Sequence, residues 1–492
     1  MFEILDTTLR EGEQTPYVNF TIDEKVEIAR LLDAVGVEMI EAGDPSVAPS
    51  VARAVEKISG LGLQAEIVAH SIASRSSIEL VKACGADRVA IFYATSKIHL
   101  DSKLHKTPEQ AIEIVCEHIA FARGLGLKVR YTPEDATRTD FEFLVRVCNA
   151  AIEAGADRIS FADTLGILQP HIMFERVCAL RQRLLPCRID LHCHDDYGLA
   201  LANAMAGIRA GADCIHTTVN GLGERTGIPD LAETIVAFHN LEGAQKYNIQ
   251  PLMNISSYLE KISGFFLAPN KPITGQNAFS HKSGVHTNGI LKDPRTYEPF
   301  DPSLLGRERK IVIDKYTGKS AVAARLDEYG IEVSRAELEV IVSRIKNLGD
   351  ERKQLFDTDI LEIAEQVTGR EIDVVPHDIS AMVMLEVESH VYTSSVVRRL
   401  RGFNNVSNVY EITGDYDIHA FVNVENVMAL NNLIEEIRTV QGVKRTETRV
   451  VLKKYNGSKG DPSGSSGEKS GASSFATQNA SYPLSGSPLQ GK

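Results

Sequence analysis

The 492-residue sequence lacks long apolar runs and has few basic residues for its number of acidic ones. No stretch approaches the roughly eighteen apolar residues that cross a membrane, so we expect no membrane partner. The 53 basic and 66 acidic residues give a net charge of −13. Nucleic acid binding needs a basic face, and this charge argues against nucleic acid as the main partner. Anionic small substrates stay compatible with it, because one or two arginines in a cleft reverse the local field.

Cysteine is also scarce, and no two cysteines have CxxC spacing. The number is odd, and most lie in apolar segments: Cys84, Cys116, Cys148, Cys178, Cys187, Cys193 and Cys214. This usage indicates reduced, structural thiols in a cytoplasmic protein. The first ten residues are acidic and polar, without a basic start and an apolar stretch, so we expect no secretory signal. The length predicts about three domains.

One pattern repeats along the first 225 residues: a short apolar run ends in polar residues, and an amphipathic helical stretch follows. Eight such units in series predict a (β/α)₈ TIM barrel over residues 1–270, since this fold takes about 250 residues. An open doubly wound sheet has the same alternation, but the count of eight favours the barrel. The expected strands are Glu3–Leu9, Val37–Ala42, Ala65–His70, Arg88–Tyr93, Leu127–Tyr131, Arg158–Ala162, Ile189–His194 and Cys214–Val219.

Three different segments follow the barrel. Residues 271–375 read as a helical linker or lid, with helices expected at Ser320–Glu328, Arg335–Asn347 and Asp357–Thr368. Residues 379–454 have the order βαββαβ and predict a ferredoxin-like domain. Residues 456–492 contain 7 Gly and 10 Ser with sparse apolar residues, which predicts a disordered tail.

Polar residues end nearly every expected barrel strand. Active sites of TIM barrels lie at these carboxyl ends, so the side chains converge on one mouth. One polar loop alone means little, but this convergence indicates an active site. The residues are Arg10, Glu11, Glu41, Asp44, His70, Arg130, Thr132, Glu134, Asp163, Thr164, His192, His194, Asn220, Glu224 and Arg225.

The sharpest motif is His192-Cys193-His194. Side chains two apart on a strand share a face, so both imidazoles face the barrel axis and Cys193 faces the helices. With Glu11 they would form a mixed nitrogen and oxygen site that suits Zn, Mn, Fe, Co or, less ideally, Mg. The alternative is two histidines that only form hydrogen bonds. Asp195 and Asp196, which follow directly, favour the metal site.

Arg10 and Arg130 have two interpretations that the sequence leaves open. They pair with Glu11 and Glu134, or they bind a substrate carboxylate through the guanidinium fork. The glycine-rich segment Gly221–Arg225 lacks both GxGxxG spacing and a P-loop lysine, so it is weak as a nucleotide motif.

Three blocks resemble the signatures of the metal-dependent barrels that condense acyl-CoA, a family that includes isopropylmalate, citramalate and homocitrate synthases. The blocks are Asp6–Gln14, His192–Gly198 and Asn220–Arg225, and the resemblance runs to about Thr368.

Within this family the sequence is most similar to the homocitrate synthases of the archaeal and Thermus-type lysine pathway, on His70, Val129–Asp135 and Gly223–Ile228. Isopropylmalate synthases usually carry Asn where Ile228 stands. The segment Ser71–Ser74 departs from the arginine-containing segment of many homocitrate synthases, which leaves the length of the 2-oxo acid open.

The resemblance implies an acyltransferase that condenses acetyl-CoA with 2-oxoglutarate to give homocitrate and CoA in lysine biosynthesis. Isopropylmalate, citramalate or re-type citrate synthesis on the same scaffold are the alternatives. The resemblance places one divalent metal (Mg, Mn, Zn or Co) on Glu11, His192 and His194. It assigns catalysis to Arg10, His286, Tyr297 and His281, and substrate binding to Arg10, His70, Arg130, Thr132 and Thr164.

The resemblance also implies partners. The segment that carries His286 resembles a lid that often comes from a second subunit, which implies a homodimer or higher homo-oligomer. Residues 379–454, with Thr413–Asp417, resemble the amino-acid-sensing domain of Lrp/AsnC regulators, and lysine is the expected effector. A transcription regulator is the alternative class, but no basic helix-turn-helix is visible. We expect Met382, Met384, Val422 and Val424 on an open sheet face that a partner covers.

Overall fold

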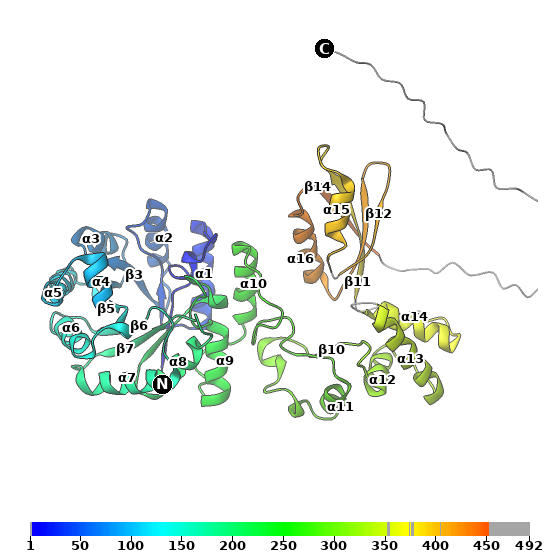
Figure 1. Ribbon diagram of the computed structural model, residues 1–492, viewed down its shortest axis with the longest axis horizontal. Helices are drawn as coiled ribbons and strands as arrows, with labels where there is room; N and C mark the ends of the chain where they lie inside the picture. Colours follow the sequence, from blue (N-terminus) through cyan, green and yellow to red (C-terminus); the bar gives the residue numbers. More distant parts are fainter. Residues whose placement is uncertain (1, 352–354, 373, 375–377, 404, 452–492) are drawn as a thin grey trace, which may run out of the picture. The chain divides into compact units, whose positions relative to one another are not determined.

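The computed structural model describes residues 2–351, 355–372, 374, 378–403 and 405–451 (Figure 1). The expected tail at 456–492 lies outside these residues. The chain divides into two compact units, Met1–Leu355 with Asp359–Arg370, and Phe356–Thr358 with Glu371–Lys492. Within the described part of the chain, no helix has both the length and the apolar character needed to cross a membrane.

The first unit contains a closed barrel of eight parallel strands in the order β1 to β8. The barrel prediction is therefore confirmed, and the open sheet is excluded. The strands are β1 (Glu3–Asp6), β2 (Met39–Glu41), β3 (Glu66–Ile72), β4 (Arg88–Ala94), β5 (Lys128–Glu134), β6 (Arg158–Asp163), β7 (Arg188–Cys193) and β8 (Cys214–Thr217).

Helices surround the barrel (Figure 1). Their starts follow from local sequence: α1 begins with a capping box between Thr21 and Glu24 and ends at Gly36, and Ile28 and Leu32 on its inner face are fully buried. The main helices of this layer are α1 (Ile22–Val35), α2 (Pro49–Ser59), α3 (Arg75–Ala83), α5 (Pro108–Gly124), α6 (Phe141–Glu153), α7 (Pro170–Arg183), α8 (Ala200–Arg209) and α9 (Leu231–Glu242).

A Gly-Ala-Asp motif occurs at Gly85–Asp87, Gly155–Asp157 and Gly211–Asp213, and each copy lies where the chain enters a strand. Asp87 accepts a hydrogen bond from the Ile67 amide at 2.9 Å, and Asp213 accepts one from Ile189 at 2.8 Å. Asp157 receives two bonds from Arg88, at 2.5 and 2.9 Å. Two of these aspartates accept from the amide of the second residue of the neighbouring strand, and so the motif stabilises the amino-terminal end of the barrel.

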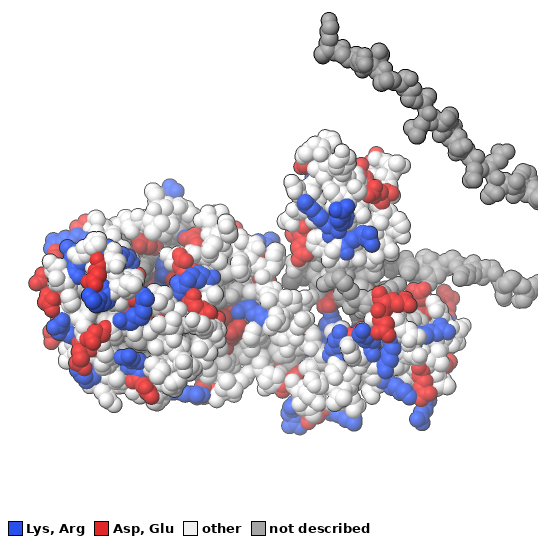
Figure 2. All heavy atoms as spheres, viewed as in Figure 1, with Lys and Arg blue, Asp and Glu red and all other residues white. Residues whose placement is uncertain are grey.

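The rest of the first unit is mostly helical. The expected helix Asp357–Thr368 is confirmed as α14. Helix α11 (Gly284–Lys292), which carries His286, was not expected. The other elements are α4 (Lys97–His99), α10 (Leu252–Ser263), a parallel strand pair of β9 (Ser280–His281) and β10 (Lys310–Ile311), α12 (Lys319–Glu328) and α13 (Arg335–Glu351). On the visible face of the barrel, acidic and basic side chains are interspersed (Figure 2).

The second unit confirms the ferredoxin-like prediction. Its elements are β11 (Ile379–Val387), α15 (Thr393–Leu400), β12 (Val406–Glu411), β13 (Ile418–Val424), α16 (Val427–Arg438) and β14 (Val443–Val450). The antiparallel sheet has the order β12-β13-β11-β14.

One expectation about this sheet is wrong. Val422 and Val424 are 1% exposed and pack in the core beneath the helices, so they do not lie on the open face. Met382 lies on the open face, where it pairs in register with Phe421. Neighbouring residues of a strand point to opposite faces, and the expectation assigned the alternating residues of β13 to the wrong face of the sheet.

Candidate active site

The mouth of the barrel brings Glu11, His192 and His194 together. Glu11 follows β1, His192 lies on β7, and His194 comes directly after that strand. The Nε2 atom of His192 lies 3.8 Å from Oε2 of Glu11, and the two imidazole rings are 5.1 Å apart. One donor atom from each residue lies within 4.8 Å of the others, and all three side chains are buried. This spacing is that of ligands around one cation.

The chemistry of the three side chains fits a divalent cation. Burial lowers the pKa of both histidines, so the imidazoles are neutral and keep a lone pair. Burial raises the pKa of Glu11, but the Arg10 guanidinium outweighs it and leaves the pKa below its usual value. The Nδ1 atom of His194 is buried without a hydrogen-bond partner among the described residues. Neutral imidazoles and a carboxylate form a suitable ligand set.

A loop after β8 holds Glu11 in place. The Glu224 amide donates to Oε1 of Glu11 at 3.0 Å, and the Thr15 hydroxyl bonds the amide and carbonyl of Gly223 at 2.7 and 3.2 Å. A Cβ atom at Gly223 would lie 3.2 Å from Glu11. The glycine-rich segment Gly221–Arg225 therefore positions a carboxylate, a role that was not predicted from the sequence.

Glu41 at the end of β2 lies between two arginines. Its Oε2 accepts from Nε of Arg10 at 2.7 Å, and its Oε1 accepts from Nη2 of Arg130 at 2.6 Å. Arg10 also pairs with Glu11, as one interpretation of the sequence held. Glu41 is fully buried, yet its pKa lies well below the usual value, because the two guanidinium groups outweigh the effect of burial.

The expected pairing of Arg130 with Glu134 is wrong. Glu134 instead accepts a hydrogen bond from Nζ of Lys103 at 2.9 Å. Strand β5 continues to Glu134, so Arg130 lies deeper in the barrel than the expected strand end at Tyr131. Four residues along a strand span about 13 Å, which is too far for an ion pair.

Three other expected substrate-binding residues surround this part of the mouth. His70 stacks on Phe92 with ring centroids 4.7 Å apart, and burial lowers its pKa. The Thr132 hydroxyl is buried without a partner among the described residues. The Thr164 hydroxyl accepts from the Asp135 amide at 2.9 Å. Thr132 pairs in register with Phe92, the residue on which the His70 ring stacks.

The sequence analysis missed a second group of donor side chains, Asp190, Cys214 and His216. All three are buried in the barrel below the mouth, and the Nδ1 atom of His216 lies 3.1 Å from that of His192. The sequence does contain a signal for part of this group, because Asp190 lies two residues before His192 and therefore on the same face of the strand.

Comparisons with known proteins agree with this architecture. The HMGL-like family matches residues 1–259, the family described as homocitrate synthase post-HMGL domain-like matches 273–353, and the Lrp/AsnC ligand binding domain matches 380–460. Proteins named homocitrate synthase from Saccharolobus solfataricus and Sulfurisphaera tokodaii are each 47% identical over 456 residues, which is 92% of this chain and 99% of theirs. The chain belongs to the homocitrate synthase family. A crystal structure of the Bacillus subtilis HMG-CoA lyase is similar with a TM-score of 0.49 and 20% identity, over 54% of this chain and 95% of that one.

The lid residues expected from the homocitrate synthase resemblance form a separate cluster. His286 on α11 stacks on Tyr297 with ring centroids 4.0 Å apart. The Nε2 atom of His281 lies 3.2 Å from Oε1 of Glu298. In the described part of the chain, no hydrogen bond, ion pair or ring contact joins His286, Tyr297 or His281 to the three residues at the mouth.

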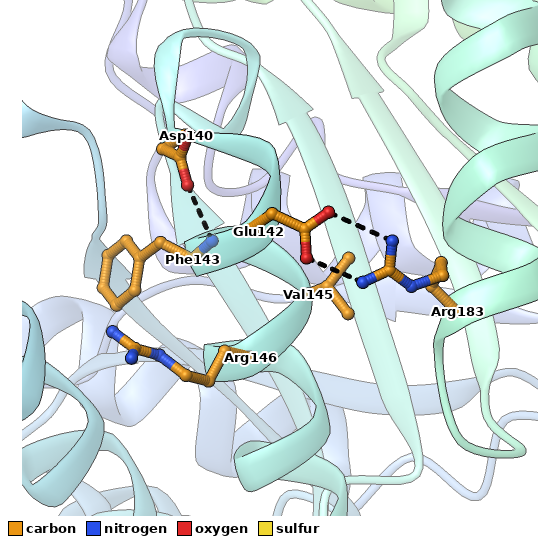
Figure 3. Close-up of a pocket in the computed structure, with 6 residues that line it drawn as sticks. All are labelled: Asp140, Glu142, Phe143, Val145, Arg146 and Arg183. Atoms are coloured by element: carbon orange, nitrogen blue, oxygen red, sulfur yellow. Dashed lines mark hydrogen bonds and ion pairs between the residues drawn. The ribbon is translucent and has the colours of Figure 1, made fainter.

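A surface pocket of about 350 Å³ lies on the helical layer of this homocitrate synthase family member, outside the barrel mouth (Figure 3). Glu142 accepts two hydrogen bonds from Arg183 there, at 3.1 and 2.7 Å. The Arg146 guanidinium lies 5.5 Å from the centre of the Phe143 ring. The charged side chains that line the pocket are paired with neighbouring residues. The pocket therefore has no part in the chemistry at the mouth.

Proposed function

We propose that the protein condenses acetyl-CoA with 2-oxoglutarate and releases homocitrate and CoA, in the synthesis of lysine. One observation carries the proposal. Glu11, His192 and His194 gather at a barrel mouth in a chain that is 47% identical, over 92% of its length, to proteins named homocitrate synthase. Membership of the family gives a condensing enzyme, and the substrates and the metal are part of the proposal.

The residues at the mouth support the carbon–carbon bond formation. Glu11, His192 and His194 would hold a divalent metal, which would supply a Lewis acid for the keto oxygen of the 2-oxo acid. Arg10 is fixed beside this site by Glu11 and Glu41. Its guanidinium stabilises the negative charge that develops on the keto oxygen.

The second carboxylate of 2-oxoglutarate needs donors deeper in the mouth. Arg130, His70, Thr132 and Thr164 supply them in this proposal. The Nε atom of Arg130 and the hydroxyl of Thr132 are both buried without a partner among the described residues. Unpaired buried donors are costly, so a substrate oxygen that accepts from them is favoured over an apolar side chain.

A base takes the methyl proton of the thioester, and we assign it to His286 with Tyr297 and His281 assisting. The lid that carries them must cover the mouth. Large apolar side chains are exposed at or just after the carboxyl ends of six strands, where a covering lid would shield them: Tyr17, Val47, Ile72, Ile98, Ile167 and Tyr197. We propose a homodimer in which the lid of each subunit covers the barrel mouth of its partner, with this exposed rim as the surface that the lid covers.

The second unit supports a regulatory role. The match to the Lrp/AsnC ligand binding domain covers it, and we propose that it binds an amino acid, with lysine as the effector. Its open sheet face carries Met382, Tyr410 and Phe421, and the last two rings contact each other at 5.9 Å. A domain that only assembles the oligomer is the alternative.

The metal-dependent condensation is tested by release of free CoA from acetyl-CoA and 2-oxoglutarate. Glu11→Gln and His194→Ala should abolish both the activity and the bound metal while the circular dichroism spectrum stays unchanged. Restored activity on adding Mn²⁺ or Mg²⁺ to chelated wild-type protein supports the proposal. Full activity after chelation and dialysis contradicts it.

A further inference from the structure

Below the mouth, the buried group of Asp190, Cys214 and His216 touches one of the proposed metal ligands. Asp190 and His192 face the barrel axis from the same strand, two residues apart. The Nδ1 atoms of His192 and His216 lie 3.1 Å apart. The Nε2 atom of His216 lies 3.5 Å from Oδ2 of Asp190. These contacts form a chain from Asp190 through His216 to His192.

The group is a poor site for a second cation of its own. Arg158 donates to Oδ1 of Asp190 at 2.7 Å, and Nη1 of Arg130 lies 3.3 Å from Nε2 of His216. Burial raises the pKa of the Cys214 thiol well above its usual value. Two guanidinium groups beside a protonated thiol disfavour a divalent ion. The group therefore acts through His192.

A hydrogen bond between two Nδ1 atoms requires one donor and one acceptor, so two arrangements of the protons fit these contacts. In the first, the Nδ1 atom of His216 donates to His192, and Nε2 of His216 accepts from Arg130. His192 then carries its proton on Nε2, the atom that lies 3.8 Å from Glu11. That proton occupies the lone pair that a metal needs.

In the second arrangement, Nδ1 of His192 donates to His216, and Nε2 of His216 carries a proton that faces Oδ2 of Asp190. The Nε2 atom of His192 is then free to bind a cation. Both imidazoles are neutral in each arrangement, so the choice is one of tautomer and not of charge. Asp190 and Arg130 compete for the same atom of His216.

The contacts of Asp190 favour the second arrangement. Arg158 donates to its Oδ1 atom at 2.7 Å, which leaves Oδ2 to face Nε2 of His216 at 3.5 Å. Its Oδ2 atom is buried and makes no hydrogen bond among the described residues. A buried carboxylate oxygen without a donor is costly, and Nε2–H of His216 is the donor within reach.

We propose that Asp190 and His216 are positioning residues that hold His192 in the tautomer whose Nε2 binds the metal, against competition from Arg130. The inference rests on the metal site of the proposed function. A carboxylate or histidine behind a metal-bound histidine fixes its tautomer and orientation, and its loss weakens metal affinity about 10- to 100-fold.

The test is a titration of the metal-free full-length protein with Mn²⁺, in which electron paramagnetic resonance measures the free ion. Asp190→Asn should weaken Mn²⁺ binding about 10- to 100-fold, because its amide can donate to His216 and favour the first arrangement. Asp190→Glu should weaken it less, because the carboxylate is kept. Cys214→Ala, in the same buried group, should bind Mn²⁺ like the wild type.

A purely structural role gives the opposite order, because Glu is larger than Asp in a buried place whereas Asn has the same shape. Asp190→Asn that folds normally by circular dichroism and binds Mn²⁺ as tightly as the wild type overturns the proposal. If Asp190→Asn does not fold, His216→Asn and His216→Leu decide. The Asn oxygen still accepts from His192, so His216→Asn should bind Mn²⁺ more tightly than His216→Leu, and equal affinities overturn the proposal.

Glu11→Gln separates this inference from the metal site itself. If Glu11→Gln leaves Mn²⁺ binding unchanged, the proposed ligand set fails and the inference falls with it. If Glu11→Gln weakens binding but Asp190→Asn does not, the metal site stands and only the role of Asp190 is overturned.

Discussion

The Nε atom of Arg10 lies 2.7 Å from Oε2 of Glu41 inside the barrel mouth. This contact fixes the guanidinium that is expected to meet the reacting oxygen. Glu41 also binds Arg130 and accepts from the Thr7 hydroxyl at 2.6 Å. One buried carboxylate therefore orients two cations of the proposed substrate site, and it was not assigned a role from the sequence.

Glu41→Ala should lower the free energy of unfolding by about 3–5 kcal/mol, because it leaves the buried Arg130 guanidinium without its carboxylate partner and removes one of the two carboxylates that hold Arg10. The pKa of Glu41 is lowered in the folded protein, so its stabilisation is complete above the unfolded pKa of about 4.3 and is lost as pH falls through the folded value. Urea unfolding at neutral and acidic pH measures both effects. Glu142→Ala removes the carboxylate of an exposed ion pair and should change stability little.

Thr132→Val should raise the KM for 2-oxoglutarate about tenfold, the effect of one lost hydrogen bond of about 1.4 kcal/mol. The KM for acetyl-CoA and the melting temperature should stay close to the wild type, because the Thr132 hydroxyl has no partner within the described chain. Ser160→Ala is the matched control. Its hydroxyl is also buried and unpaired, but it pairs in register with Asp190, below the metal ligands. Equal KM changes in the two variants would contradict the assignment of Thr132.

Gly227→Ala should distort the backbone of the loop that positions Glu11. A Cβ atom at Gly227 would lie 1.7 Å from the Gly221 carbonyl oxygen, at a φ of +81°. Gly198→Ala is the control, because its φ is +70° and nothing lies within 4 Å of the added atom. Both changes carry a left-handed backbone penalty of about 1–2 kcal/mol. Gly227→Ala should also lower Mn²⁺ affinity, and loss of affinity in Gly198→Ala alone would refute this role.

A chain that ends near Glu371 keeps the first unit and removes the second, apart from Phe356–Thr358. Its condensation activity should persist, and its inhibition by lysine should fall, because an effector acts only through a state that it binds preferentially. Steady-state rates with and without lysine measure the difference. Equally strong inhibition of the truncated and full-length enzymes would place the effector at the barrel.

Much of the fold could be read from the sequence, because each buried strand of the barrel is a short apolar run and each helix carries an apolar face. The same periodicity gave the βαββαβ order of the second unit. The error at Val422 and Val424 was avoidable, because β13 alternates cleanly. Ile418, Ala420, Val422 and Val424 form one apolar face, which the helices cover, and the other face carries His419, Phe421 and Asn423.

The candidate site was readable where spacing within one strand sufficed, as for His192 and His194. The partners of Arg130 could not be predicted from the sequence. Glu41 lies 89 residues away, and the depth of Arg130 in the barrel depends on where β5 ends. The contact between His192 and His216 depends on strand pairing between β7 and β8, which closes only in the folded barrel. Long-range contacts of this kind have no local signal in the chain.

The central claim is most directly tested by measuring free CoA release with a panel of 2-oxo acids under one set of conditions. 2-Oxoglutarate, oxaloacetate, 2-oxoisovalerate and pyruvate differ in the group that meets Arg130, His70 and Thr132. The account predicts the highest kcat/KM for 2-oxoglutarate, with homocitrate as the product. A higher kcat/KM for 2-oxoisovalerate, pyruvate or oxaloacetate would contradict it and assign the protein to isopropylmalate, citramalate or citrate synthesis.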